Sequence, residues 1–147
     1  MNHSPAQVLG QYMIDQGLFG SDRSADWALF VGSLPDKPTR CACVYDTAGM
    51  QDGRSIRSGQ LFEHPGCQLR GRGGSSDYEL GFQKMNDAHE ELSLAQNVWV
   101  YLDSSVYVIQ NISATSTIIP LGMEPGSTRR MGWTCNFILT LSLEDES

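Results

Sequence analysis

WTCNFILTLSL, residues 133–143, is the clearest structural element in this 147-residue chain. From Trp133 to Leu143 every second residue is apolar, and the residues between them are mostly polar. Because successive side chains of a strand point to opposite faces, the alternation predicts a strand with one buried face. Eleven residues would span about 36 Å, roughly twice the usual strand length. We therefore expect this strand to be central in a sheet, or else to pair in part outside its own subunit, and we expect the acidic residues 144–147 to fray.

Further strands are predicted upstream of this element. Short apolar runs bounded by turn residues predict strands at 26–32 and 40–46, and alternation predicts a third at 67–72. The runs NVWVYL, residues 97–102, and VYVIQNI, residues 106–112, flank a short polar turn and predict a hairpin.

The N-terminal segment carries the signals of a helix. Ser4, Pro5 and Gln7 suit the N-cap, the first helical position and the third position of a helix. Gly17 suits the residue just after a helix end, where a left-handed backbone is favoured. We expect a helix over residues 4–17.

A second helix is predicted from about 77 to 94. Ser76 and Glu79 have the spacing of a capping box that would open it. Apolar residues recur at intervals of three and four, which predicts one buried stripe. The stripe consists of Tyr78, Gly81, Met85, Ala88 and Leu92.

Together these elements predict a single α+β domain over residues 1–147. We expect a mostly antiparallel sheet of four to six strands with the two main helices packed on one face, because each apolar face must be buried against another. The length and the 40% hydrophobic content suit one domain with its own core.

Composition narrows the possible partners. Seventeen acidic and ten basic residues give a formal net charge of −7, which disfavours the phosphate contacts of a nucleic-acid binder. Apolar runs such as FILTL are far shorter than the roughly 20 residues that span a bilayer, and the N-terminus has no basic segment followed by an apolar one. We expect a soluble protein made in the cytoplasm, without a membrane partner.

A glycine-rich turn between the predicted third strand and second helix resembles a phosphate-binding loop, and the resemblance fails on inspection. A dinucleotide fingerprint that starts at Gly71 places Ser76 where the third glycine belongs. A phosphate loop that starts at Gly66 places Arg72 and Gly73 where lysine and serine or threonine belong. The turn is therefore interpreted as structural, and no cofactor is expected.

The cysteines and histidines do not form a metal-binding pattern. Cys41 and Cys43 are one residue apart in a predicted strand and so share one face. The three histidines are isolated from cysteines and carboxylates at ligand spacing. We expect free, buried thiols, with a zinc site as the alternative. The residues concerned are Cys41, Cys43, Cys67 and Cys135, and His3, His64 and His89.

No catalytic constellation is evident in the sequence. No serine lies in a G-x-S-x-G elbow, and no histidine lies near a carboxylate on a recognisable element. We therefore expect a non-enzymatic protein, and the sheet, the two helices and the arginine-bearing loops are typical of an assembly subunit.

Two stretches carry a resemblance to a known family. LFVGSLPDKPTRCACVYDTAG, residues 29–49, has a strand that ends in glycine, then Leu-Pro-Asp, then a strand that ends in Tyr-Asp-Thr. HPGCQLRGRGGSSDYELGFQKMNDAHEEL, residues 64–92, has a proline, a Gln-x-x-x-Arg strand and a tyrosine-bearing helix. With the N-terminal helix and the long last strand, the chain resembles the siphophage tail terminator and minor capsid proteins over nearly its whole length.

The resemblance implies a virion protein of the head–tail junction, assembled in the host cytoplasm. It implies a homo-oligomeric ring, usually a hexamer, that sits on the last ring of the tail tube, stops its polymerisation and offers a docking face to the neck. DNA would pass through the lumen without specific binding, which agrees with the acidic composition. The partners would be the tail tube protein, a neck protein and further copies of the chain itself.

Seven residues are predicted to make subunit or partner contacts. Segments 47–60 and 118–130 are predicted to be long mobile loops that become ordered on contact with a partner. The polar side of the predicted third strand is expected to face a neighbouring subunit. The predicted contact residues are Arg54, Arg57, Arg129 and Arg130 in the loops, and Gln68, Arg70 and Arg72 on the strand.

Two other functions remain open at this point. A head-completion or connector protein would also form a ring, but it would bind the portal side of the junction. A cellular enzyme or binding module would be a monomer or dimer with a deep pocket.

Overall fold

The computed structural model describes residues 3–54, 61–124 and 129–146. Its described part is an α+β fold, as predicted, with two helices and one sheet. The helices are α1 (Pro5–Asp15) and α2 (Tyr78–Leu94). The strands are β1 (Ala28–Val31), β2 (Cys41–Arg54), β3 (Leu61–Gly74), β4 (Gln96–Leu102), β5 (Ser105–Ala114), β6 (Ile119–Met123) and β7 (Arg130–Glu146).

The sheet has the order β1-β2-β3-β7-β5-β4, and β6 pairs with β7 off this path. Only the β1–β2 pair is parallel among the described pairs, so the predicted antiparallel character is confirmed. The described sheet has seven strands, one more than the largest number predicted, because β6 was missed.

Strand β7 is central, which decides between the two explanations of its length. It pairs with β3 on one side and with β5 and β6 on the other. The expected fraying of the acidic end is wrong for the described residues, because Asp145 pairs with Val106 and Glu146 pairs with Ser105. Ladder hydrogen bonds to β5 hold this end in place, whatever its charge.

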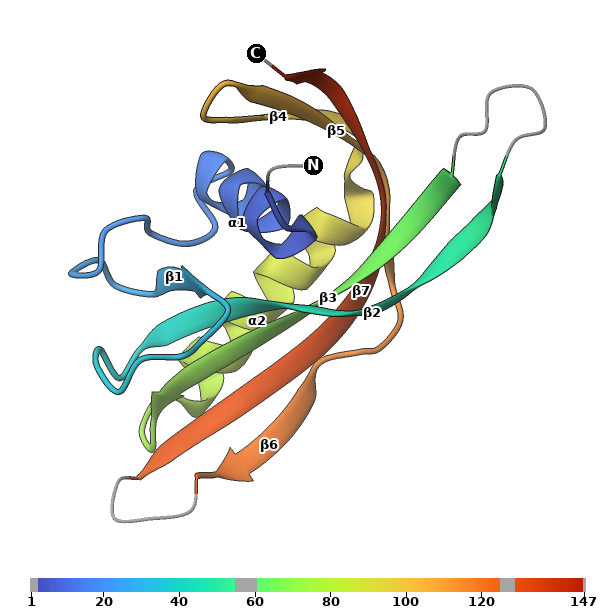
Figure 1. The fold of residues 1–147 in the computed structure, drawn as a ribbon. Coiled ribbons are helices and arrows are strands. Elements are labelled where there is room, and N and C mark those ends of the chain that lie inside the picture. The colour runs from blue at the N-terminus through green and yellow to red at the C-terminus, as the bar shows by residue number, and fades with distance from the viewer. Residues whose placement is uncertain (1–2, 55–60, 125–128, 147) are drawn as a thin grey trace.

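Both helices lie on one face of the sheet, as predicted. Figure 1 shows the sheet curling around α1 and α2, with β4 and β5 at one end and β6 at the other. Helix α1 contacts β1, β2, β3 and β4, and helix α2 contacts β3, β5 and β7. We call the opposite side of the sheet its outer face.

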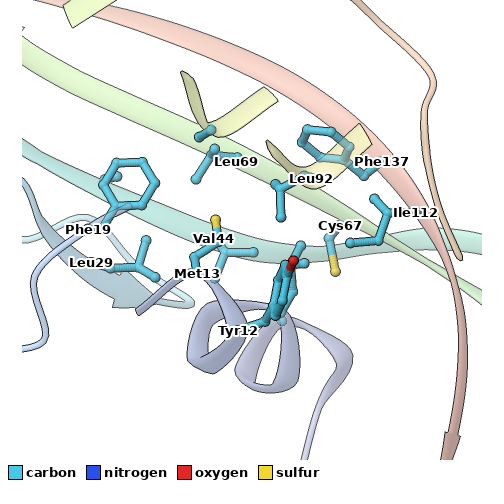
Figure 2. Close-up of a cluster of buried hydrophobic side chains, with 14 of the residues drawn as sticks. Tyr12, Met13, Phe19, Leu29, Val44, Cys67, Leu69, Leu92, Ile112 and Phe137 are labelled. Carbon is cyan, nitrogen blue, oxygen red and sulfur yellow. The ribbon is translucent and has the colours of Figure 1, made fainter. Parts of the chain in front are cut away.

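The core lies between the helices and the sheet. Figure 2 shows Tyr12 and Met13 of α1 pointing toward the side chains of the sheet and of α2. Met85 and Phe137, on α2 and β7, are both buried, as the two predicted apolar faces require. Burial of a large apolar side chain contributes roughly 1.5–3 kcal/mol, so this cluster supplies the main stabilisation of the fold.

Helix α1 has the predicted ends. The Ser4 hydroxyl accepts from the Gln7 N–H at 3.2 Å, and the Gln7 side chain accepts from the Ser4 N–H at 2.7 Å, which completes the capping box. At the other end Gly17 has a φ of 72°, and the N–H of Leu18 donates to the carbonyl of Met13. These bonds satisfy backbone groups that a helix end leaves unpaired.

Helix α2 begins differently from the prediction. Its N-cap is Asp77, and the expected capping box of Ser76 and Glu79 is wrong. The Asp77 carboxylate accepts from the N–H of Gly74 at 2.7 Å and from the guanidinium of Arg40 at 2.7 and 3.1 Å. The acidic residue next to Ser76 therefore closes the turn between β3 and α2.

The two predicted loops are largely strands. Residues 47–54 continue β2, and residues 119–123 form β6. Glycine and proline led the sequence analysis to predict loops here, but pairing with neighbouring strands outweighs local preference. Residues 55–60 and 125–128 lie outside the described part, so the predicted mobility of those segments stays a prediction.

Candidate assembly surfaces

The polar side of β3 lies on the outer face of the sheet. Cys67 and Leu69 belong to the helix-side core, so the alternating residues Gln68, Arg70 and Arg72 point the other way, as predicted. Their register partners on β7 are Asn136, Thr134 and Gly132.

Arg72 is buried and holds the segment 33–40 on the outer face. Only 4% of the residue is exposed. Its guanidinium donates to the carbonyl oxygens of Pro35 at 2.5 Å and Pro38 at 2.8 Å, and at 3.3 Å to those of Asp36 and Thr39. Five donors in a fixed plane suit several carbonyls at once. Nε and Nη2 of Arg72 are thus engaged inside the chain, and the surfaces proposed below do not include Arg72.

Arg130 has a second contact with the same segment. Its Nη1 lies 3.2 Å from Oδ1 of Asp36, and the residue is buried, whereas Arg129 is exposed. Both arginines lie where β7 begins, next to the β6 end of the sheet.

Gln68 and Arg70 differ in how far they are engaged. Gln68 donates to Asn136 at 3.3 Å, and the Asn136 N–H donates to the hydroxyl of Ser116. Arg70 is half-buried and makes no ion pair with another described residue. Its charge lies near Tyr45, whose pKa is raised mainly by burial. Of the two described arginines on this face of β3, Arg70 is therefore the one that remains available to a partner.

A hairpin of β2 and β3 projects beyond the rest of the sheet. Strand β1 pairs with β2 only as far as Val44, and β7 pairs with β3 only from Gly66. Past these points β2 and β3 pair only with each other in the described part, as Figure 1 shows. We call residues 48–54 and 61–65 the arm. Arg54 is the last residue of β2, and Arg57 lies outside the described residues.

These placements separate the predicted contact residues into distinct regions. Arg54 belongs to the arm, whereas Arg129 and Arg130 lie at the beginning of β7. The structure brings Gln68, Arg70 and Arg72 together on β3. The residues therefore do not form a single site.

The sequence analysis missed an apolar surface on β4. Val100 faces the core, whereas Trp99 and Tyr101 point outward and are 56% and 67% exposed. We call these two exposed side chains the β4 surface. The run NVWVYL has apolar residues at nearly every position, and a strand with two apolar faces is the signal that could have revealed this surface.

Further large apolar side chains are exposed on β6 and at the beginning of α2. The ring of Tyr78 lies 6.2 Å from that of Trp133, and Trp133 pairs with Pro120 of β6, so both elements adjoin Trp133. The exposed side chains of α2 lie on the helix side of the sheet, whereas Leu121 of β6 lies over Gly132 on the outer face. We call these side chains together the β6–α2 surface; its exposed members are Tyr78, Leu80 and Phe82 on α2 and Ile119, Leu121 and Met123 on β6.

The interior offers little chemistry. The four cysteines are unpaired and buried, as predicted. Burial raises the pKa of Cys67 and of Cys135 to about 12, so neither is a thiolate at neutral pH. The described residues contain no group of three histidines, cysteines or carboxylates that could hold a metal ion.

None of the described helices has the length and apolar character needed to cross a membrane.

Comparison with known proteins identifies the family. The sequence model of the family described as bacteriophage tail terminator protein matches residues 11–121. The chain belongs to this tail terminator family. Membership makes it a structural component of a phage tail that interacts with other phage tail or head components, which confirms the resemblance noted in the sequence. A search of curated proteins gave no match.

Proposed function

We propose that copies of this chain form a ring, a homohexamer in the simplest case, that caps the tail tube and stops its polymerisation. The ring would sit at the head–tail junction, present a docking face to the neck protein and assemble in the host cytoplasm. Membership in the tail terminator family supports this role. The observation that carries it is a pair of unlike apolar surfaces on one small subunit.

Two unlike surfaces suit a subunit that meets two different neighbours. Strand β5, which carries β4, pairs with the C-terminal part of β7, whereas β6 pairs with its beginning. We assign the β4 surface to a neighbouring subunit. A contact between unlike patches of two subunits proceeds head to tail and closes into a ring when the rotation permits.

We assign the β6–α2 surface to the tail tube protein. Three apolar side chains on one strand and three on the adjoining helix are a large exposed set for a subunit of this size, and such patches mark protein contacts. The exposed Arg129 lies next to this surface and can pair with an acidic group at its polar rim.

DNA passage agrees with the charge of the chain. A net charge of −7 weakens attraction to a phosphate backbone. A ring of such subunits would let DNA pass through its lumen without holding it.

The tube contact can be tested with Phe82→Glu, which places a charge on the β6–α2 surface. Phe82 is 40% exposed, so the subunit should fold. Tube protein polymerised with wild-type subunit should give tubes of limited length, whereas tubes made with the variant should grow as though no subunit were present. Ser93→Glu adds the same charge to an exposed position near the end of α2 and should still limit growth.

The result that would overturn the proposal is limited tube growth with Phe82→Glu and wild type alike, or no effect of the wild-type subunit on tubes. Binding of the wild-type subunit to portal, without binding to tube protein, would favour a head-completion protein instead.

A further inference from the structure

Besides the arm, the sheet has three margins in the described residues, and they differ in how they are protected. At β1, Gly20 forms a bridge to Ala28, and its carbonyl accepts from the N–H of Leu29 at 2.9 Å, so this edge is partly covered. At β6, Pro120 has no N–H to offer, and Gly122 has a φ of 75° beside a break in register. Both features disfavour the addition of another strand.

Strand β4 lacks a proline and a break in register, and its one positive φ, 50° at Asn97, lies near its beginning. Its sequence QNVWVYL contains no proline and no charged residue. From Val98 to Leu102 its register with β5 runs without interruption, and β4 pairs with no other strand among the described residues. A regular, uncharged edge of this kind is a template for pairing with another chain.

We propose that the free edge of β4 pairs with the arm of a second copy of the chain, so that a continuous sheet crosses each subunit boundary. This inference rests on the ring proposed above and specifies the contact that would build it. In that contact Trp99 and Tyr101 would be covered by the neighbour.

The arm is the segment that fits this edge. Within the described residues, residues 48–54 of β2 pair only with β3, so this strand has an unused edge, and its register with β3 shifts twice along this stretch. A two-stranded ribbon is marginally stable in water, and a third strand would stabilise it. The arm also projects away from its own core, where a neighbour can reach it. Pairing of β4 with β4 would instead close a dimer and leave the arm uncovered.

Hydrogen–deuterium exchange of wild-type monomer and ring, separated by size, tests the inference directly. Amides of residues 98–102 and 48–54 should exchange at least tenfold more slowly in the ring than in the monomer. Amides of β6 should not change, because β6 is assigned to the tube. Slow exchange reports new backbone hydrogen bonds, which a contact through side chains alone would not produce.

Two variants give an independent measurement. The double variant Trp99→Lys, Tyr101→Lys adds charges to exposed positions on β4, so it should keep the wild-type melting temperature. It should form rings only at a protein concentration at least tenfold higher than the wild type needs. Ile119→Lys, on the protected β6 edge, should form rings at the wild-type concentration.

The outcomes separate this inference from the proposed function. Rings in which β4 and the arm exchange as fast as in the monomer would overturn the inference and leave the ring intact. A two-copy assembly with β4 protected and the arm unprotected would overturn the arm as partner. A chain that stays monomeric at all concentrations, with and without tube protein, would overturn the ring and the inference together.

Discussion

The indole ring of Trp133 on β7 lies against the Cα of Gly81 on α2, where a β carbon would overlap its six-membered ring. Trp133 is only 1% exposed, so the ring has no free space to move into. Gly81→Ala adds that β carbon. Overpacking costs roughly 1–3 kcal/mol, and alanine regains about 1 kcal/mol of helix propensity at most. We expect a net loss of about 1–2 kcal/mol in the free energy of unfolding, measured with urea.

Gly71→Ala is the matched control for this substitution. A β carbon at Gly71 would lie 2.7 Å from Sδ of Met85, the flexible part of a long side chain. Methionine adapts to such changes more easily than an indole, so the loss should stay below about 1 kcal/mol. Equal losses for the two variants would contradict this explanation of the helix–sheet packing.

Arg72→Ala should destabilise the subunit, whereas Arg70→Ala should not. Removal of the Arg72 guanidinium leaves the carbonyls of segment 33–40 without their donor, and we expect a loss of about 2–3 kcal/mol in unfolding free energy. Arg70 makes no ion pair with a described residue, so its variant should keep its stability. Denaturant unfolding measures both variants, and a stable Arg72→Ala subunit would refute the assignment.

The ion pair between Arg40 and Asp77 should make stability depend on pH in acid. The Arg40 guanidinium, aided by the N–H of Gly74, lowers the pKa of Asp77 in the folded chain. Its contribution is therefore complete above the unfolded pKa of about 3.9 and disappears as the pH falls through the lowered folded value. Asp77→Asn should melt at a lower temperature than wild type at pH 7.

The same variant supplies the control for this pH effect. As the pH falls through the lowered folded pKa of Asp77, the carboxylate becomes protonated, so the two melting temperatures should converge. A difference that stays constant as the pH is lowered would show that the charge of Asp77 is unimportant.

The thiols should be unreactive in the folded subunit. All four cysteines are buried, and burial raises the pKa of each of them. A disulfide reagent at pH 8 should therefore modify none of them in the native chain and all four in denaturant. Chelators should leave the melting temperature unchanged. Rapid native labelling of a cysteine, or one zinc per chain in native mass spectrometry, would contradict this prediction.

Local patterns predicted the elements whose signals lie within a few residues. The alternation of 133–143 identified β7, and the three-and-four spacing of Met85, Ala88 and Leu92 identified the buried stripe of α2. Ser4 and Gln7 predicted the first cap, because all its partners lie within one turn.

Contacts between distant segments could not be predicted in this way. Alternation placed Arg72 on the polar side of its strand, but nothing local indicated that segment 33–40 would cover it. Pro120 and Gly122 made β6 resemble a loop, although β7 pairs with it. For the same reason Asp77, which Arg40 engages from 37 residues away, replaced the predicted capping box.

Electron cryomicroscopy of tail tubes assembled with this subunit tests the central claim most directly. The account predicts that tubes stop growing and carry at one end a closed ring whose repeating unit has the curled sheet and two helices described above. Tubes that continue to lengthen, with no density for this fold at either end, would contradict it.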